Sequence, residues 1–246
     1  MKKRYFVLDA FRGFALVNMI LYHALWDIVN MFHVSIPWFK SDAAHIWQQC
    51  ICWSFILLSG FCWSFGKKKL KNALTVLGAS VIITAVTAVF MKSSIILFGV
   101  LTLLGSSMLV MIPLDKVLRK LNPYVGLVLF FLLFFATKNI SDGFVGIGDK
   151  VFFEIPGELY SNYLSAYLGF PFAGFYSSDY FPLVPWIFLF VCGYFLHHIF
   201  TRMKLMKHLS AFRCRPLEFL GRHSLILYMI HQPVVYGVLF LVFRFV

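Results

Sequence analysis

The chain has 246 residues, of which 61% are hydrophobic and only 13% are charged, whereas about a quarter of residues are charged in a soluble domain. This composition excludes a soluble globular protein and indicates a polytopic membrane protein. The formal net charge of +12 is typical of basic cytoplasmic loops that face anionic lipid headgroups. Nucleic-acid binding is not expected, because the basic residues are dispersed among the loops instead of gathered on one module.

The first apolar segment, residues 7–30, is unusual because it carries Asp9, Arg12, His23 and Asp27. Ionisable side chains at membrane depth are costly on a lipid-facing surface, so they indicate a protein interior and a functional role. His23 and Asp27 are four residues apart and share one face of a helix, where the carboxylate can orient the imidazole. The segment therefore predicts a base with an orienting acid, about 15 Å deep in the membrane at ~1.5 Å per residue.

Six further apolar segments follow, and the loops between them are short except for a long one at residues 138–179. The segments are residues 47–66, 72–91, 94–114, 123–137, 180–200 and 223–243. With the N-terminus inside, most Lys and Arg residues fall in the inner loops, as the positive-inside rule requires. The sequence therefore predicts an all-α transmembrane bundle of about seven spans, forming a single domain over residues 1–246. We expect it in the cell membrane, N-terminus inside and C-terminus outside, with membrane lipids as partners.

Two connecting segments have a structure of their own. The outer loop is rich in aromatic residues, so its part from Leu159 to Leu168 is expected at the membrane interface or folded back as a lid. Ser178 or Asp179 is expected to cap the sixth span, with Pro182 in its first turn. The inner segment 201–222 fits either an amphipathic basic helix on the lipid surface or a solvated connector.

A second deep histidine, His231, lies in the last apolar segment, two residues before Pro233. Counted from Ser224 it lies about 10 Å into the span at ~1.5 Å per residue, so it and His23 can meet in one cavity. Either histidine is also compatible with a simple packing role. The five cysteines form no metal-type pair, and no metal, nucleotide or serine-hydrolase motif is present. The candidate catalytic groups that remain are a histidine and a carboxylate, which favour transfer of an acyl group, and no metal is expected.

Several motifs carry a family resemblance. The first segment reads RYFVLDAFRGFALVNMILYHALWD, with LDxxRG followed by a histidine ten residues after the glycine. FILLSGF, FGVLTLLG, DYFPLVPW and LEFLGRHSLILYMIHQP follow along the chain. In these patches the chain resembles the integral-membrane acyltransferases, and more closely their small bacterial branch grouped with the catalytic domain of heparan-alpha-glucosaminide N-acetyltransferase.

The resemblance implies transfer of an acyl group, typically acetyl, from cytosolic acyl-CoA to a hydroxyl or amino group of an extracytoplasmic carbohydrate. His23 matches the histidine that the family places in its first span, and Asp9, Arg12 and Gly13 match its LDxxRG motif. On this interpretation His23 is the general base and Asp27 holds it.

The remaining site residues follow from that interpretation. The CoA phosphates are expected near Arg12, with its neighbour Asp9, and near Arg222. His231 or Ser59 is expected to donate to the developing oxyanion. Acceptor binding is expected near Asp179 and Tyr180.

Two alternatives remain open at this stage. Arg12 can serve only as an anchor at the inner interface, paired with Asp9. The whole chain can also be a small-molecule or proton-coupled transporter, because polar residues at mid-membrane and a last helix broken by proline suit a substrate pathway. The lack of paired inverted halves argues against the transporter.

Overall fold

The computed structural model describes residues 5–148, 150–211 and 213–244. Lys2, Lys3 and Arg4, which belong to the inner basic residues, and Asp149 of the long loop lie outside this range. Seven helices of the described part are long and apolar enough to cross a membrane, which confirms the predicted number of spans. The chain divides into two compact units, Met1–Leu58 with Met203–Val246, and Ser59–Arg202.

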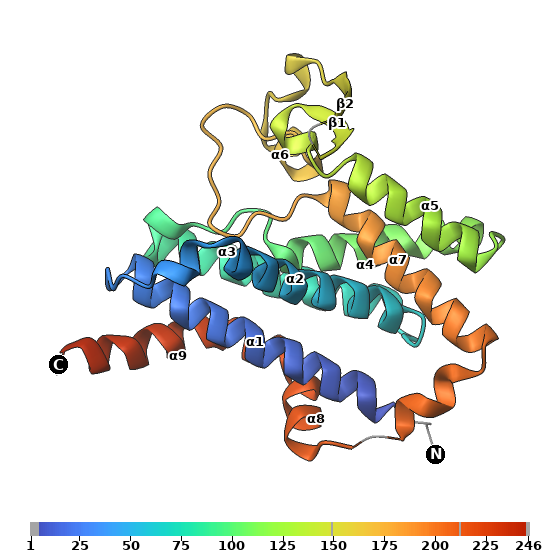
Figure 1. The fold of residues 1–246 in the computed structure, drawn as a ribbon, viewed down its shortest axis with the longest axis horizontal. Helices are drawn as coiled ribbons and strands as arrows, with labels where there is room; N and C mark the ends of the chain where they lie inside the picture. Colours follow the sequence, from blue (N-terminus) through green and yellow to red (C-terminus); the bar gives the residue numbers. More distant parts are fainter. Residues whose placement is uncertain (1–4, 149, 212, 245–246) are drawn as a thin grey trace. The chain divides into compact units, whose positions relative to one another are not determined.

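The first unit is built around α1. Its helices are α1 (Phe6–Asn30), the first part of α2 (Asp42–Trp63), α8 (Arg215–Arg222) and α9 (Ser224–Arg244). Helix α1 packs against both α8 and α9 (Figure 1). Leu16, Met19 and Ile51 form a buried core between α1 and α2, and Trp47 of α2 donates a hydrogen bond to Asn18 at 3.0 Å.

Helices α1 and α9 run parallel. The ring of His23 lies 5.0 Å from that of His231, and beyond the C-terminal end of α1 the ring of Phe32 stacks on Phe243 at 4.7 Å. The two helices thus advance together from one end of the pair to the other. Phe6 and Arg244 consequently lie at opposite ends of the pair.

Helix α8 crosses α1 at two glycines. A Cβ atom at Gly13 would overlap the carbonyl oxygen of Leu217, and one at Gly221 would overlap that of Asp9. Glycine is required on both sides because the two backbones touch. The segment 201–222 is therefore neither a solvated connector nor wholly a surface helix, since α8 buries Glu218 and Gly221 while Phe219 stays exposed. A 3₁₀ turn at Leu205–Ser210 precedes it.

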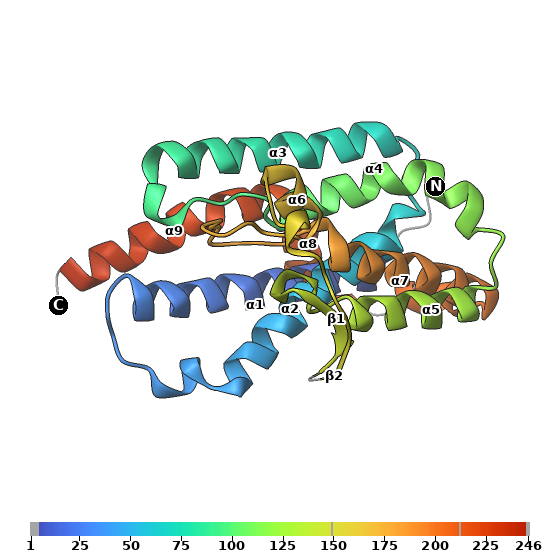
Figure 2. The same ribbon diagram turned by 90° about the horizontal axis from the view of Figure 1, so that it is seen from above.

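The second unit is centred on α7 (Leu183–Arg202), whose Leu189, Phe190 and Tyr194 are fully buried. The other long helices are α3 (Lys69–Phe90), α4 (Val100–Leu118) and α5 (Pro123–Ala136). Helix α7 packs against α4 and α5, and α3 lies along α4 (Figure 2). The end of α2 reaches α7 through Gly60, where a Cβ atom would overlap the carbonyl oxygen of Phe190.

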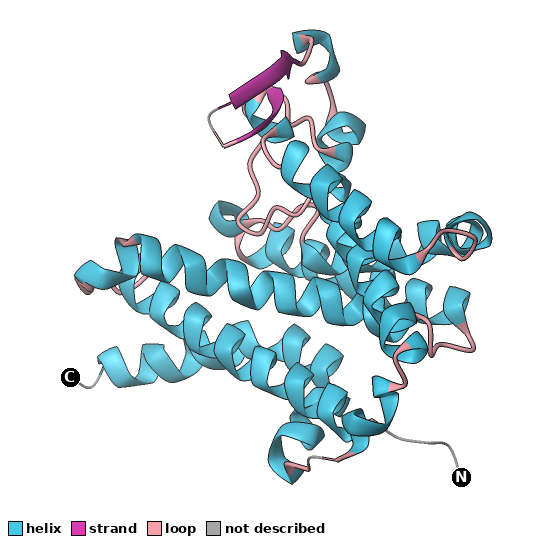
Figure 3. Ribbon diagram, turned by 45° about the vertical axis from the view of Figure 1, so that its right-hand side comes forward, coloured by secondary structure: helices cyan, strands magenta, loops and turns pink. Residues whose placement is uncertain are grey.

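The long loop contains the strands found in the described part of the chain. Strands β1 (Phe144–Ile147) and β2 (Lys150–Glu154) form an antiparallel hairpin, and the short helix α6 (Tyr163–Leu168) follows (Figure 3). The described part is thus mostly helical, but the all-α prediction omitted this hairpin. No clear alternation of polar and apolar residues marks the two strands in the sequence, so the pattern gave little sign of them.

Two predicted helix starts are wrong, and one contact explains both. Helix α4 begins at Val100 instead of residue 94, and α7 begins at Leu183 instead of residue 180. The apolar stretch before α4 is not helical, and its backbone is hydrogen-bonded to the segment before α7, with Phe181 N donating to Phe98 O at 2.9 Å. Helix α2 also begins earlier than the predicted residue 47, at Asp42, because the helix continues beyond its apolar part.

Candidate functional site

The predicted histidine and carboxylate residues come together between α1 and α9. His23 and Asp27 lie one turn apart on α1, and His231 and Gln232 are consecutive on α9. The imidazole rings of His23 and His231 are 5.0 Å apart between centroids. Gln232 Nε2 donates a hydrogen bond to Asp27 Oδ1 at 2.8 Å. We call these four residues the α1–α9 cluster.

The hydrogen bond of His231 fixes its tautomer. Its Nδ1 lies 2.5 Å from the carbonyl oxygen of Tyr228, and because a carbonyl oxygen can only accept, Nδ1 must carry the proton. In the neutral ring Nε2 then has a free lone pair. This Nε2 is buried and has no hydrogen-bond partner among the described residues. In this tautomer Nε2 of His231 can accept a proton, and the donation to an oxyanion that the sequence suggested for His231 stays a prediction.

Asp27 binds a different partner from the expected one. Its side chain is completely buried, and Gln232 rather than His23 donates to it. Its second oxygen, Oδ2, has no hydrogen-bond partner in the described part of the chain, and neither has Oε1 of Gln232. Sequence reasoning missed Gln232, although it directly follows His231 in the HQP motif. Asp27 is thus linked to α9 by a hydrogen bond and to His23 by its position on α1.

Three of the eight buried side-chain atoms that have no hydrogen-bond partner among the described residues lie in this cluster: Asp27 Oδ2, Gln232 Oε1 and His231 Nε2. Buried polar atoms without partners are rare in proteins, and each one calls for a water, an ion or a ligand. All three accept and none donates. The cluster is consequently suited to a ligand group that carries several N–H or O–H donors.

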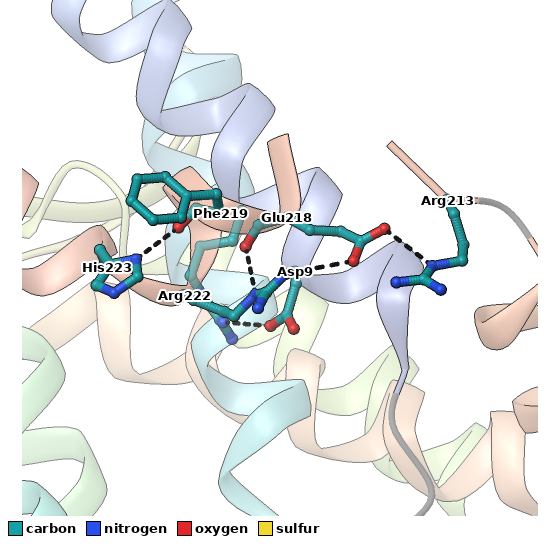
Figure 4. Close-up of polar contacts among 7 residues, drawn as sticks. Asp9, Arg213, Glu218, Phe219, Arg222 and His223 are labelled. Atoms are coloured by element: carbon teal, nitrogen blue, oxygen red, sulfur yellow. Dashed lines mark hydrogen bonds and ion pairs between the residues drawn. The ribbon is translucent and has the colours of Figure 1, made fainter. Parts of the chain in front are cut away.

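A second polar group lies where α1 crosses α8 (Figure 4). The carboxylate of Glu218 is completely buried, with Arg213 Nε 3.6 Å from Oε1 and Arg222 Nη2 3.5 Å from Oε2. Arg12 Nη1 lies 3.4 Å from Asp9 Oδ1, so the anchoring pair weighed for these two residues is present. Arg12 and His23 are eleven residues apart on α1, about 16 Å at ~1.5 Å per residue, so this group is separate from the α1–α9 cluster.

Arg12 and Arg222 each lie next to one of the two contacting glycines, Gly13 and Gly221, so both belong to the crossing of α1 and α8. Both guanidinium groups are ion-paired with carboxylates, Arg12 with Asp9 and Arg222 with Glu218, and the carbonyl oxygen of Glu218 also accepts from Arg222 Nε at 3.1 Å. Glu218 was not singled out from the sequence, although it lies in the LEFLGRHS motif.

The three remaining predicted residues belong to the second unit. Ser59 lies in α2. Asp179 does not cap α7; its Oδ2 accepts from Val100 N at 3.3 Å, at the N-terminal end of α4. Tyr180 donates to the carbonyl oxygen of Ala166 in α6 at 2.6 Å. Burial raises the pKa of Tyr180 to about 12, so its hydroxyl remains protonated and keeps donating at neutral pH.

The second unit also holds a polar network that the sequence did not reveal. Tyr194 donates to Asp115 Oδ1 at 2.7 Å, and Lys69 Nζ lies 3.8 Å from Asp115 Oδ2. The same ammonium lies 3.3 Å from the ring centroid of Trp63. Asp115 is the one acid in the basic stretch DKVLRK, which is the signal that could have indicated it. This network joins α2, α3, α4 and α7, which gives it a structural role.

A comparison with known families identifies the chain. The sequence model of the family described as heparan-alpha-glucosaminide N-acetyltransferase, catalytic, matches residues 4–233. The chain belongs to this family. The match covers nearly the whole chain and confirms the resemblance carried by the motifs. No curated protein and no solved structure matches the chain.

As a member of this acetyltransferase family, the protein is a transferase. The seven apolar helices of its described part make it a multi-pass membrane protein. Among the described residues, no group of three or more His, Cys, Asp or Glu side chains is placed to hold a metal ion. The α1–α9 cluster and the pair of arginines at the α8 crossing lie within the matched residues.

Proposed function

We propose that the protein transfers an acetyl group from cytosolic acetyl-CoA, or another acyl-CoA, to an amino or hydroxyl group of an extracytoplasmic carbohydrate. The observation that carries the proposal is the set of three unpaired acceptor atoms in the buried α1–α9 cluster. The parallel course of α1 and α9 supports termini on opposite sides of the membrane, and the basic residues of the predicted inner loops support a cytosolic N-terminus. We place the enzyme in the plasma membrane.

The cluster favours an amine over a hydroxyl as the acceptor group. An amino group brings more N–H donors than a hydroxyl brings O–H donors, and the carboxylate of Asp27 attracts its positive form. The ammonium form gives one proton to Nε2 of His231, and the resulting neutral amine attacks the thioester carbonyl carbon. The new C–N bond forms, the C–S bond breaks, the nitrogen loses a second proton, and CoA takes up that proton and leaves as the thiol. His23, 5.0 Å from His231 between ring centroids, is the proposed partner that donates to the oxyanion or relays the proton.

The donor is proposed to bind through its phosphates at the crossing of α1 and α8. Arg12 and Arg222 offer charge-assisted hydrogen bonds there, and planar guanidinium groups match phosphate oxygens well. Ser59, Asp179 and Tyr180 belong to the other unit, and their roles in oxyanion or acceptor binding stay predictions.

The experiment is release of free CoA by the purified protein in liposomes, supplied with acetyl-CoA and with either an amino sugar or its hydroxyl analogue. We expect release that requires the sugar, is faster with the amine, and is lost in His23→Ala and His231→Ala. His208→Ala, a change at an exposed histidine of the 3₁₀ turn, is the matched control and should retain activity. Sugar uptake that needs His23 but releases no CoA would instead establish the transporter.

A further inference from the structure

We propose that Gln232 is a positioning residue for the transfer: it holds the carboxylate of Asp27 by one oxygen and keeps the other oxygen free for the acceptor substrate. The inference rests on the proposed function and deepens it, because it assigns a role to a residue that neither the motifs nor the family description singles out. It stands on the geometry of the α1–α9 cluster alone.

The hydrogen bond between Gln232 and Asp27 joins two helices that are far apart in the sequence. Its donor–acceptor distance of 2.8 Å is that of a well-formed bond. Asp27 is completely buried and no other residue in the described part of the chain donates to it. Without the amide of Gln232, the carboxylate would have no protein donor to determine its rotation about the Cβ–Cγ bond. Gln232 thereby determines which oxygen of Asp27 stays open.

One turn of α9 carries both His231 and Gln232. His231 and Gln232 are consecutive, so the lone pair of His231 Nε2 and the carboxylate of Asp27 are tied to one rigid helical segment. Oε1 of Gln232 is itself buried and unpaired. Each partner of the pair thus keeps one buried acceptor atom that no described residue satisfies and that a donor group of the substrate can fill. Gln232 therefore fixes the carboxylate of Asp27 and leaves Asp27 Oδ2 available to a substrate.

The test compares three substitutions in the reconstituted protein. Gln232→Glu keeps the shape but replaces the donating amide by a carboxylate, Gln232→Leu removes all hydrogen bonding, and Val234→Leu changes an exposed residue of the same helix as the control. We expect both changes at Gln232 to lower kcat/KM for the acceptor about 10- to 100-fold, the range for a lost hydrogen bond to a charged group. The KM for acetyl-CoA should stay at the wild-type value in both Gln232 variants. Val234→Leu should have the wild-type kcat/KM for the acceptor.

A double-mutant cycle separates positioning from an independent effect. If Gln232 acts through Asp27, adding Gln232→Leu to Asp27→Asn should lower the rate less than about twofold further, because the partner is already altered. Multiplicative losses in the double variant would overturn the inference. Wild-type kinetic constants in Gln232→Leu would overturn it as well.

A spectroscopic measurement tests the contact independently of activity. The chain contains three glutamines, Gln48, Gln49 and Gln232, so ¹⁵N-glutamine labelling gives a small set of side-chain amide resonances. Gln232→Leu assigns the Gln232 amide, and Asp27→Leu should shift that resonance without moving the other two. If Asp27→Leu leaves the chemical shift of the Gln232 amide unchanged, the inference is overturned, whatever the activity of the variant. If the resonance shifts but the wild type transfers no acetyl group, the pairing stands and the proposed function is refuted.

Discussion

Gly221→Ala gives a sharp test of the close crossing between α1 and α8. A Cβ atom at this position would overlap the carbonyl oxygen of Asp9 and lie 3.0 Å from the amide nitrogen of Gly13. Both obstacles are backbone atoms, so no side-chain rotation can make room and the helices must separate. Separation would also move Arg222, which follows directly on α8.

The magnitude follows from a comparison with Gly237→Ala on α9, where no atom lies within 4 Å of the added Cβ. Both substitutions gain about 1 kcal/mol of helix propensity over glycine, which cancels in the comparison. The overlap at Gly221 costs about 1–3 kcal/mol, the usual range for overpacking. At about 2–4 °C per kcal/mol for a chain of this size, Gly221→Ala should melt roughly 2 to 12 °C below Gly237→Ala.

The assay is thermal unfolding of the detergent-solubilised variants, followed by the loss of the monodisperse peak in size-exclusion chromatography. The wild type should melt about 2–4 °C below Gly237→Ala, and at or above Gly221→Ala. A Gly221→Ala protein as stable as Gly237→Ala would refute the close crossing of α1 and α8.

Two further predictions concern the second unit. Tyr194→Phe removes the donor to Asp115, so the melting temperature should fall by a few degrees, given about 1.5 kcal/mol or somewhat more for a hydrogen bond to a charged group; an unchanged melting temperature would contradict the role of the network. Asp179→Ala removes the acceptor at the start of α4, which should cost about 1 kcal/mol, as helix N-caps do. For Asp179→Ala, faster hydrogen exchange at Val100 is the direct measurement, and exchange at the wild-type rate would count against the cap.

The number and course of the spans could be predicted from the sequence because a membrane helix needs a long apolar run. α1, α3, α5 and α9 begin and end within a few residues of their predicted bounds. The start of α4 could not be predicted the same way, because Ile95 to Phe98 are apolar yet not helical. The hydrogen bonds of Ile95, Leu97 and Phe98 go to residues about eighty positions later, and those of Ile96 go to Thr84 and Thr87 of α3. Hydropathy reports the surroundings of a residue and not its hydrogen-bond partner.

The candidate site was predicted only in part, for a related reason. The spacing of His23 and Asp27 correctly places them on one helix face, and the depth of His231 correctly brings it to His23. The partner of Asp27 is Gln232, from the last helix, and no local spacing can reveal a contact that depends on how two distant helices pack. The tautomer of His231 likewise depends on the carbonyl of Tyr228.

The measurement that tests the central claim most directly is transfer of a labelled acetyl group across the bilayer. Purified protein is reconstituted into vesicles with isotopically labelled acetyl-CoA on one side only and an amino sugar on the other, and the sugar is analysed by mass spectrometry. We predict a labelled N-acetyl sugar with the wild type and none with His231→Ala. A wild-type protein that leaves the sugar unlabelled, or that labels it only when both substrates share one side, would contradict the account.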